Sequence, residues 1–322
     1  MKRLLLVFNP RSSHFWQVER DILTKVRELR GWMVGKYEIS DTDVDDNARK
    51  LSKIVMDGDV VVAAGGDGTA NIAVNGILLS GATGVKFGVM GYGNFNDMAR
   101  MFGDFSLEEI LEKSGKEVWP LECRINGKHW RYAMCYFTVG MFAEACAVFD
   151  KPEVRKKLQK KHRRKSLIGS IWSLSMWWFR EHKREFLPDF SVKNSSDEMI
   201  HCDNCSDYMA INSPSVARIM KGGDYYRGEN YFLSNIGCMT KFFKLISMMM
   251  RSMFKKVPGI ESDYDCLILE KASKIMLQAE GEYKMIDDVK TIEIEKTVTP
   301  MMVVMKCRRM WLDVPSISWR GL

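Results

Sequence analysis

The sequence has little histidine, no cysteine-dense segment and no long, strongly apolar run. Its 8 cysteines are scattered over 322 residues, which excludes the dense disulfide framework of a small secreted protein and predicts reduced thiols in the cytosol. The uncharged, tryptophan-rich stretch at residues 166–179 is too short to cross a bilayer. The apolar run at residues 4–8 ends without a small-residue cleavage site, so we expect a buried strand there and not a signal peptide.

Histidines and cysteines form no pattern typical of a metal or catalytic centre. The 5 histidines are isolated and suggest no triad with a nucleophilic serine or cysteine. Cys202 and Cys205 have the spacing of a zinc-ligand pair, but no second pair follows, and we expect a plain loop. No zinc-finger, helix-turn-helix or RNA-recognition pattern is visible, which argues against a nucleic-acid partner.

What is present is typical of a folded chain with a substantial core. Hydrophobic residues make up 46% and charged residues 28% of the sequence. The net charge of +7 favours anionic partners such as phosphates or acidic lipid surfaces.

The most informative stretch is residues 61–76, an apolar run that ends in a cluster of glycines and continues with helical spacing. Gly65, Gly66 and Gly68 allow the backbone to approach a ligand closely. The N–H groups of such a turn and of the following helix form an anion site, although an ordinary strand-to-helix turn has the same local pattern. Asp67 lies in the turn, where its carboxylate could hold the loop or reach a magnesium ion.

Strands and helices alternate over the first hundred residues. Apolar runs at residues 2–8, 32–39, 59–64 and 85–90 are separated by helical patterns, which predicts a parallel sheet. We therefore expect a Rossmann-like α/β domain over residues 1–118. Residues 119–322 are rich in strand patterns, and we expect an antiparallel β-sandwich with helical insertions, whose last residues pack back on the first domain.

Two further turns follow strands of the predicted sheet, where open α/β sheets bind ligands. Asn9, Pro10, Arg11, Ser12 and Ser13 follow the first strand and have side chains suited to phosphate or ribose contacts. A second glycine- and asparagine-rich turn follows the fourth strand at residues 91–97.

These motifs resemble those of the diacylglycerol kinase catalytic-domain superfamily, especially its bacterial soluble lipid kinases, with sphingosine and NAD kinases as wider relatives. The segment from Gly65 to Thr69, followed by Asn71, Asn75 and Gly76, is similar to the signature motif of that family almost letter for letter. Residues 91–100 resemble a second family segment, from which Gly91, Asn94 and Phe95 depart.

The resemblance implies an ATP- and magnesium-dependent kinase, with the nucleotide between the two domains. The nucleotide-contacting residues that it implies, together with those of the turns above, are Asn9, Pro10, Arg11, Ser12, Ser13, Thr42, Gly65, Gly66, Asp67, Gly68, Thr69, Ala70, Asn71, Gly93, Asn94 and Asn96.

The resemblance also implies the catalytic and metal-binding residues. Glu282 matches the family's general base, and Glu280 stands two residues before it, where the family has aspartate. Glu229, flanked by Tyr226 and Tyr231, stands at the position of the aspartate that helps to hold magnesium.

Two segments combine basic and aromatic residues. Residues 155–165 carry a run of lysines and arginines before a tryptophan-rich stretch, and residues 241–256 are similar. Such segments suit the surface of an anionic membrane, although a core-packed helix beside a solvated charge run has the same composition. We expect a cytoplasmic, peripherally membrane-associated protein that phosphorylates a lipid, and we leave a homodimer open.

Two other functions stay open. An NAD kinase-like enzyme shares the Gly-Gly-Asp-Gly-Thr turn. A catalytically silent nucleotide- or lipid-binding module is the other alternative, because Asn94, Phe95, Glu229 and Glu280 depart from the family pattern.

Overall fold

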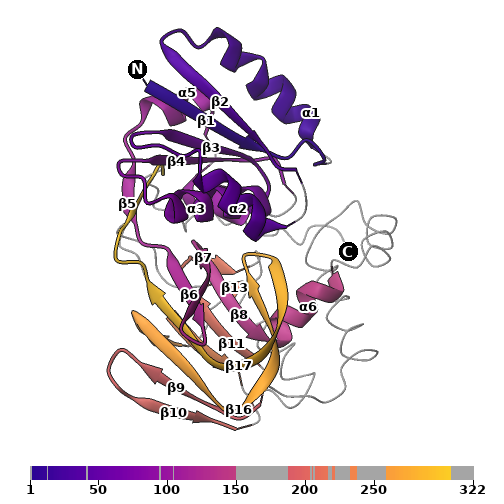
Figure 1. Ribbon diagram of the computed structural model, residues 1–322, viewed down its shortest axis with the longest axis vertical. Helices are drawn as coiled ribbons and strands as arrows, with labels where there is room; N and C mark the ends of the chain where they lie inside the picture. The colour runs from indigo at the N-terminus through magenta and orange to yellow at the C-terminus, as the bar shows by residue number, and fades with distance from the viewer. Residues whose placement is uncertain are drawn as a thin grey trace, which may run out of the picture.

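The structure is a computed structural model that describes residues 2–12, 14–40, 43–93, 96–103, 105–149, 188–203, 205, 207–216, 220–221, 233–237 and 259–305. It contains two sheets stacked along the long axis of the molecule, with the early part of the chain in one sheet and most of the later part in the other (Figure 1). Outside these ranges lie Ser13, Thr42, Asn94 and Phe95, and also residues 151–187, 222–232 and 238–258.

The first sheet has six strands in the order β2–β1–β3–β4–β18–β5. These strands are β1 (Lys2–Phe8), β2 (Trp32–Glu38), β3 (Val60–Gly65), β4 (Lys86–Gly91), β5 (Lys116–Val118) and β18 (Met301–Val303). All neighbours pair in parallel except β5, which is antiparallel to β18. β3 is apolar and buried along its whole length because helices cover both faces of the sheet.

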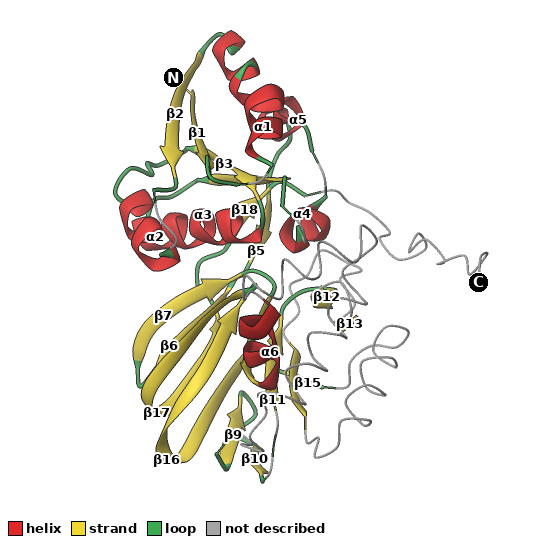
Figure 2. Cartoon of the chain, turned by 90° about the vertical axis from the view of Figure 1, so that its right-hand side faces the viewer, coloured by secondary structure: helices red, strands yellow, loops and turns green. Residues whose placement is uncertain are grey.

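Helices lie on both faces of this sheet (Figure 2). They are α1 (Phe15–Val18), which continues as a π-helical turn (Glu19–Leu23) and a 3₁₀ turn (Lys25–Glu28), α2 (Val44–Ser52), α3 (Asp67–Ser80), α4 (Asp97–Phe102) and α5 (Leu107–Glu112). Leu5 and Val7 of β1 share a core with α2 and α3. Leu4 and Leu6 point to the other face, where they share a core with α1 and α5. Side chains alternate along a strand, so one apolar strand supplies both cores.

The second sheet is antiparallel and has ten strands. They are β6 (Leu121–Ile125), β7 (Lys128–Ala133), β8 (Tyr136–Gly140), β9 (Phe190–Asn194), β10 (Met199–Cys202), β11 (Asp207–Ile211), β14 (Leu233–Gly237), β15 (Ile260–Glu261), β16 (Tyr264–Ala279) and β17 (Glu282–Lys296). A helix, α6 (Met141–Phe149), follows β8, and β12 (Ser215–Val216) pairs with β13 (Met220–Lys221) separately. The core of this sheet is one apolar cluster with members on β6, β8, β11, β16 and β17.

The predicted fold class is confirmed: a parallel sheet with helices is followed by an antiparallel β domain. The Asn126-Gly127 turn between β6 and β7 has positive φ at both residues, as a two-residue hairpin turn of this kind requires. Among the strand patterns of the second half, the apolar runs at residues 265–269 and 275–279 belong to one 16-residue strand, β16, whose register with β17 shifts between Ile268 and Ser273. An irregularity within the strand, and not a turn, separates the two runs.

The plain loop expected around Cys202 and Cys205 is only partly correct. Cys202 ends β10, and both thiols are buried in the core of the second sheet. Among the described residues, no group of three or more His, Cys, Asp or Glu side chains is arranged to hold a metal ion.

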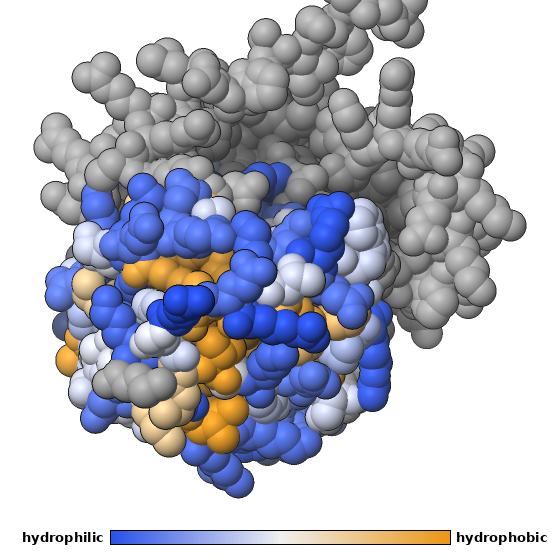
Figure 3. All heavy atoms as spheres, turned by 90° about the horizontal axis from the view of Figure 1, so that it is seen from above, coloured by the Kyte–Doolittle hydropathy of each residue, from blue (hydrophilic) through white to orange (hydrophobic). Residues whose placement is uncertain are grey.

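No helix in the described ranges is long and apolar enough to cross a membrane. Figure 3 shows the molecule from above, with polar side chains over most of the described surface and apolar ones between them. Trp16 and Met33 are among the exposed apolar residues of the chain, at 55% and 52%. Scattered exposures of this kind are ordinary for a folded domain. The two basic and aromatic segments expected at a membrane lie outside the described residues.

Candidate active site

The two glycine turns lie side by side at the carboxyl ends of two neighbouring strands of the first sheet. β3 and β4 pair in parallel as far as Gly65 and Gly91, and the N–H of Tyr92 donates to the carbonyl of Gly65 at 2.9 Å. A Cβ atom added to Gly93 would lie 2.4 Å from the Cα of Gly66. The two backbones therefore touch, and a larger residue at Gly93 would push the turns apart.

The first turn leads directly into α3. Gly66 is the N-cap of this helix, and no side chain of the described residues caps it. The N–H of Ala70 already donates to the carbonyl of Gly66, at 3.1 Å. The donors of Asp67, Gly68 and Thr69 precede the first intrahelical bond, which makes this end of α3 suited to an anion.

Asp67 ties the first turn to the second. Its Oδ1 accepts the backbone N–H of Met98 at 3.2 Å, in the first turn of α4. Burial raises the pKa of Asp67 to about 6, the negative charge of Asp97 adds to this, and the backbone hydrogen bonds from Met98 and Asp97 oppose it. Asp97 was a motif residue in the sequence, but no local signal indicated its electrostatic effect on Asp67.

Asn96 shapes the second turn. It adopts a left-handed backbone conformation, with φ of 53°, and its Oδ1 accepts the N–H of Gly93 at 2.7 Å. Asparagine tolerates this conformation better than most residues. Asn96 therefore closes its own turn, and its neighbour Asn94 lies outside the described residues.

The turn between β16 and β17 brings two glutamates to the first glycine turn. Glu280 and Gly281 have φ values of 52° and 91°, as expected for the central residues of a type I′ hairpin turn. The Glu280 side chain is 5% exposed, and both of its oxygens have partners: the N–H of Cys135 donates to Oε1 at 2.5 Å, and Nδ2 of Asn71 donates to Oε2 at 2.9 Å.

This environment favours the protonated form of Glu280. Burial raises its pKa to about 7, the negative charge of Asp67 adds to this, and the hydrogen bonds from Cys135 and Asn71 act in the other direction. Because both oxygens face protein donors, Glu280 holds the hairpin in place and does not point to open space.

Glu282 lies directly over the first turn of α3. A Cβ atom added to Gly68 would be 2.8 Å from Oε1 of Glu282, so any larger residue there would displace this carboxylate from its position. Glu282 and Gly68 are far apart in the sequence, and the hairpin that begins β17 brings them together.

Asn75 joins α3 to the second sheet. Its Oδ1 accepts the N–H of Tyr132 at 2.8 Å, and its Nδ2 donates to the carbonyl of Tyr132 at 3.0 Å. The side-chain amide thus pairs with β7 as a neighbouring strand would. Glycine at position 76 is explained by packing between helices, because a Cβ atom there would lie 2.6 Å from Leu51 of α2.

The loop after β1 lies beside the first glycine turn, because β1 and β3 are parallel neighbours and both segments follow the carboxyl ends of their strands. The N–H of Arg11 donates to Oδ1 of Asn9 at 2.9 Å, and the N–H of Ser12 donates to the carbonyl of Asn9 at 3.1 Å. Pro10 follows Asn9 within this closed turn. The other predicted contacts Ser13, Thr42, Tyr226, Glu229 and Tyr231 lie outside the described residues.

Comparison with known proteins agrees with this geometry. Residues 3–118 match the family model of the diacylglycerol kinase catalytic domain. The matched residues make up roughly a third of the chain. The resemblance seen in the sequence motifs is thereby confirmed for the part of the chain that holds both glycine turns.

Solved structures extend the similarity of fold to nearly the whole chain. The crystal structure of a diacylglycerol kinase from Bacillus anthracis strain Sterne is 13% identical, with a TM-score of 0.64 over 95% of this chain and 97% of that one. Two further structures from the same strain are each 14% identical, with TM-scores of 0.64 and 0.63 over the same shares. At such identities the match concerns the fold. No curated protein matches the sequence.

Proposed function

We propose that the protein is an ATP- and magnesium-dependent lipid kinase that transfers the γ-phosphate to a hydroxyl group of a lipid. The observation that carries the proposal is the Glu282 carboxylate over Gly68, at the uncapped end of α3. A general base and a phosphate site are thus adjacent, as phosphoryl transfer requires.

The glycine turn supplies the phosphate site. Backbone N–H donors at the start of α3 and the close approach of the two turns suit the β- and γ-phosphates of ATP. The loop of Asn9, Pro10, Arg11 and Ser12, at the carboxyl end of the neighbouring strand β1, would contact the rest of the nucleotide.

Asp67 fits a magnesium ion. Burial raises the pKa of Asp67, the negative charge of Asp97 adds to this, and a bound divalent cation would offset both effects. Carboxylate oxygens are the ligands that magnesium prefers. Bound magnesium would neutralise charge on the phosphates, and Glu229, which lies outside the described residues, would be a second ligand.

Glu282 is the proposed general base. It accepts the proton of the lipid hydroxyl while the hydroxyl oxygen bonds to the γ-phosphorus, and the bond from that phosphorus to the β–γ bridging oxygen breaks, which releases ADP. General-base assistance contributes about 10²–10⁴-fold to the rate. Glu280 supports this step by fixing the hairpin, and so we assign it a positioning role.

The lipid acceptor is proposed from the family of residues 3–118 and from the diacylglycerol kinase named among the similar structures. A diacylglycerol-like or sphingoid lipid in a cytoplasmic-facing membrane leaflet is the expected substrate. The basic and aromatic segments at residues 155–165 and 241–256 would hold the protein at that surface.

The test is transfer of labelled γ-phosphate from ATP and magnesium into vesicles of a mixed lipid extract. Wild type should label a lipid, Glu282→Ala should abolish the label, and the control Asp287→Ala, on the exposed part of β17, should retain it. Label in NAD would favour the NAD kinase-like alternative. ATP binding without label in any acceptor would favour a silent binding module and contradict the proposal.

A further inference from the structure

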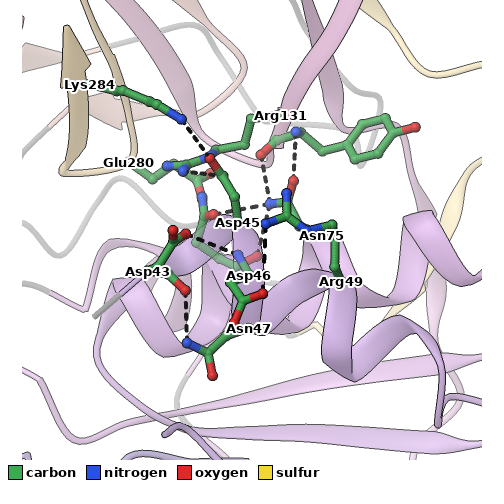
Figure 4. A network of polar contacts seen from close by, with 11 residues as sticks. Asp43, Asp45, Asp46, Asn47, Arg49, Asn75, Arg131, Glu280 and Lys284 are labelled. Carbon is green, nitrogen blue, oxygen red and sulfur yellow. Dashed lines mark hydrogen bonds and ion pairs between the residues drawn. The ribbon is translucent and has the colours of Figure 1, made fainter. Parts of the chain in front are cut away.

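A single carboxylate connects the first domain to two strands of the second sheet. Oδ1 of Asp45, in the first turn of α2, accepts a hydrogen bond from Nε of Arg131 at 3.0 Å. The same oxygen also accepts a hydrogen bond from Nη2 of Arg131. Oδ2 of Asp45 lies 3.3 Å from Nζ of Lys284 (Figure 4). Arg131 belongs to β7 and Lys284 to β17, and β6 separates these two strands.

The Asp45–Arg131 pair is shielded from water. The Arg131 side chain is 6% exposed and that of Asp45 is 20% exposed. Burial alone would raise the pKa of Asp45, but the charges of Arg131 and Lys284 outweigh it and lower the pKa below its ordinary value. Two N–H groups of Arg131 converge on one carboxylate oxygen, which fixes the orientation of the guanidinium as well as its distance from Asp45.

The strand that carries Lys284 also carries Glu282. Residues two apart on a strand point to the same side, so the two side chains face the first domain together. Glu282 lies over Gly68 of α3, and Lys284 reaches Asp45 of α2. The two helices pack closely where Gly76 meets Leu51, and they therefore present Gly68 and Asp45 as one surface.

Glu282 is thus held from both sides along the chain. On the N-terminal side, Glu280 bonds to Cys135 and Asn71. On the C-terminal side, Lys284 bonds to Asp45, which also fixes β7 through Arg131. Loss of Asp45 would leave the Glu280 anchor and the Asn75–Tyr132 pairing in place, so the domains would stay together while β17 could tilt.

We infer that Asp45 is a positioning residue for the phosphoryl-transfer step: through Arg131 and Lys284 it sets the distance of the Glu282 carboxylate from the first turn of α3. This inference rests on the proposed function, because it assumes that Glu282 is the general base. Asp45 itself contacts neither nucleotide nor acceptor in this assignment. Its role is to orient β17.

The test compares Asp45→Asn with a matched control, Asp46→Asn. Both residues lie in the first turn of α2, but Asp46 pairs with Arg49 and Lys50 of its own helix and, in the described part of the chain, with no strand of the second sheet. Both variants remove one negative charge from the helix N-terminus. Asp45→Asn should lower kcat by roughly 10–100-fold and change the KM for ATP by less than about threefold, because small displacements of a catalytic group cost about this much. Asp46→Asn should match wild type.

A second variant guards against misfolding. The Lys284 side chain is 55% exposed, so Lys284→Gln should fold and should lower kcat in the same direction by a smaller factor. Asp45→Asn with Lys284→Gln should then resemble Asp45→Asn alone, because both changes act through one contact. Arg131→Lys should restore part of the activity that Arg131→Met loses. Equal kcat values for Asp45→Asn and Asp46→Asn, or wild-type kcat in Lys284→Gln, would overturn the inference.

Hydrogen–deuterium exchange separates this inference from the proposed function. If wild type transfers phosphate to no acceptor, the kinase proposal fails, yet the restraint of β17 by Asp45 can still be measured. Peptides from the first half of β17 should exchange faster in Asp45→Asn than in Asp46→Asn. Equal exchange in the two variants would show that Asp45 does not restrain the strand.

Discussion

The side-chain amide of Asn71 donates to the carboxylate of Glu280 at 2.9 Å across 209 positions of sequence. This bond joins α3 of the parallel sheet to a hairpin of the antiparallel sheet. It links the glycine turn that suits a phosphate to the strand that carries the candidate base. Four expected outcomes follow from this site and its surroundings.

Glu280 should make the free energy of unfolding depend on pH. Its pKa is raised from an ordinary value of 4.5 to about 7, so its stabilising contribution is complete below about pH 4.5 and is lost as the pH rises to about 7. The difference corresponds to roughly 3 kcal/mol. Glu280→Gln should therefore lose less stability than wild type between pH 5 and pH 8 in urea titrations. The variant Asp287→Asn, at an exposed position of the same hairpin, should show the same pH dependence as wild type. If the free energy of unfolding of Glu280→Gln falls with pH as steeply as that of wild type, the raised pKa of Glu280 is contradicted.

Gly68→Ala should reduce activity without reducing stability. The added methyl group would meet Oε1 of Glu282 at 2.8 Å and displace the carboxylate, whereas alanine favours a helix by up to about 1 kcal/mol over glycine. We expect kcat to fall by about tenfold or more, and by at most the roughly 10²–10⁴-fold that general-base catalysis contributes. Steady-state kinetics and thermal unfolding measure the two effects. The control is Gly35→Ala, whose methyl group would meet only the flexible end of Leu5 within 3.4 Å.

Gly76→Ala should destabilise the protein although it places alanine in a helix. The new methyl group would lie 2.6 Å from Leu51, and overpacking of this kind costs about 1–3 kcal/mol. Leu51→Ala alone should cost about 2–5 kcal/mol because it leaves a cavity in the core. The double variant should cost less than the sum, since each change relieves the other. If the two changes in the free energy of unfolding add exactly in urea titrations, α2 can move away from α3 and the contact between Gly76 and Leu51 does not constrain it.

Asp67→Asn should stabilise the protein in EDTA and remove its stabilisation by magnesium. The pKa of Asp67 is raised from 3.8 to about 6, so at pH 8 the ionised group destabilises the fold by roughly 3 kcal/mol, and asparagine still offers an oxygen to Met98. Wild type should gain stability with magnesium in proportion to the logarithm of its concentration. Urea titrations in EDTA and in magnesium measure both effects. If magnesium raises the free energy of unfolding equally in wild type and in Asp67→Asn, the cation does not bind at Asp67.

The sequence predicted the local features of the site better than its long-range contacts. The glycine turns at Gly65 and Gly93 were evident because backbone turns need particular residues within a few positions. Glu282 became a candidate only through the family resemblance, and its contact with Gly68 was not predicted, since nothing in either segment alone indicates its partner. Asp45, Arg131 and Lys284 were overlooked for the same reason, because each is an ordinary charged residue until the fold brings them together.

Some elements of the fold were missed for other physical reasons. The hairpin of β9 and β10 carries polar residues such as Lys193 and His201, which obscure its alternation. The helical pattern between the apolar runs at residues 2–8 and 32–39 gave no sign that its helix, which begins at Phe15, contains π and 3₁₀ turns. The hydrogen bonds of these turns differ from those of an α-helix, although the apolar spacing is similar.

The return of β18 to the first sheet determines how the two halves of the chain can move. The backbone passes between the sheets twice, from β5 to β6 and from β17 to β18, and the N–H of Thr297 donates to the carbonyl of Pro120 at 2.9 Å where the two passages run together. Because β18 is the neighbour of β5 among the described strands, a fragment that ended at Val118 would lose its last strand and expose the edge of β4. Any opening between the two sheets would have to turn about these two passages, and it would carry the hairpin tip that bears Glu282 away from α3.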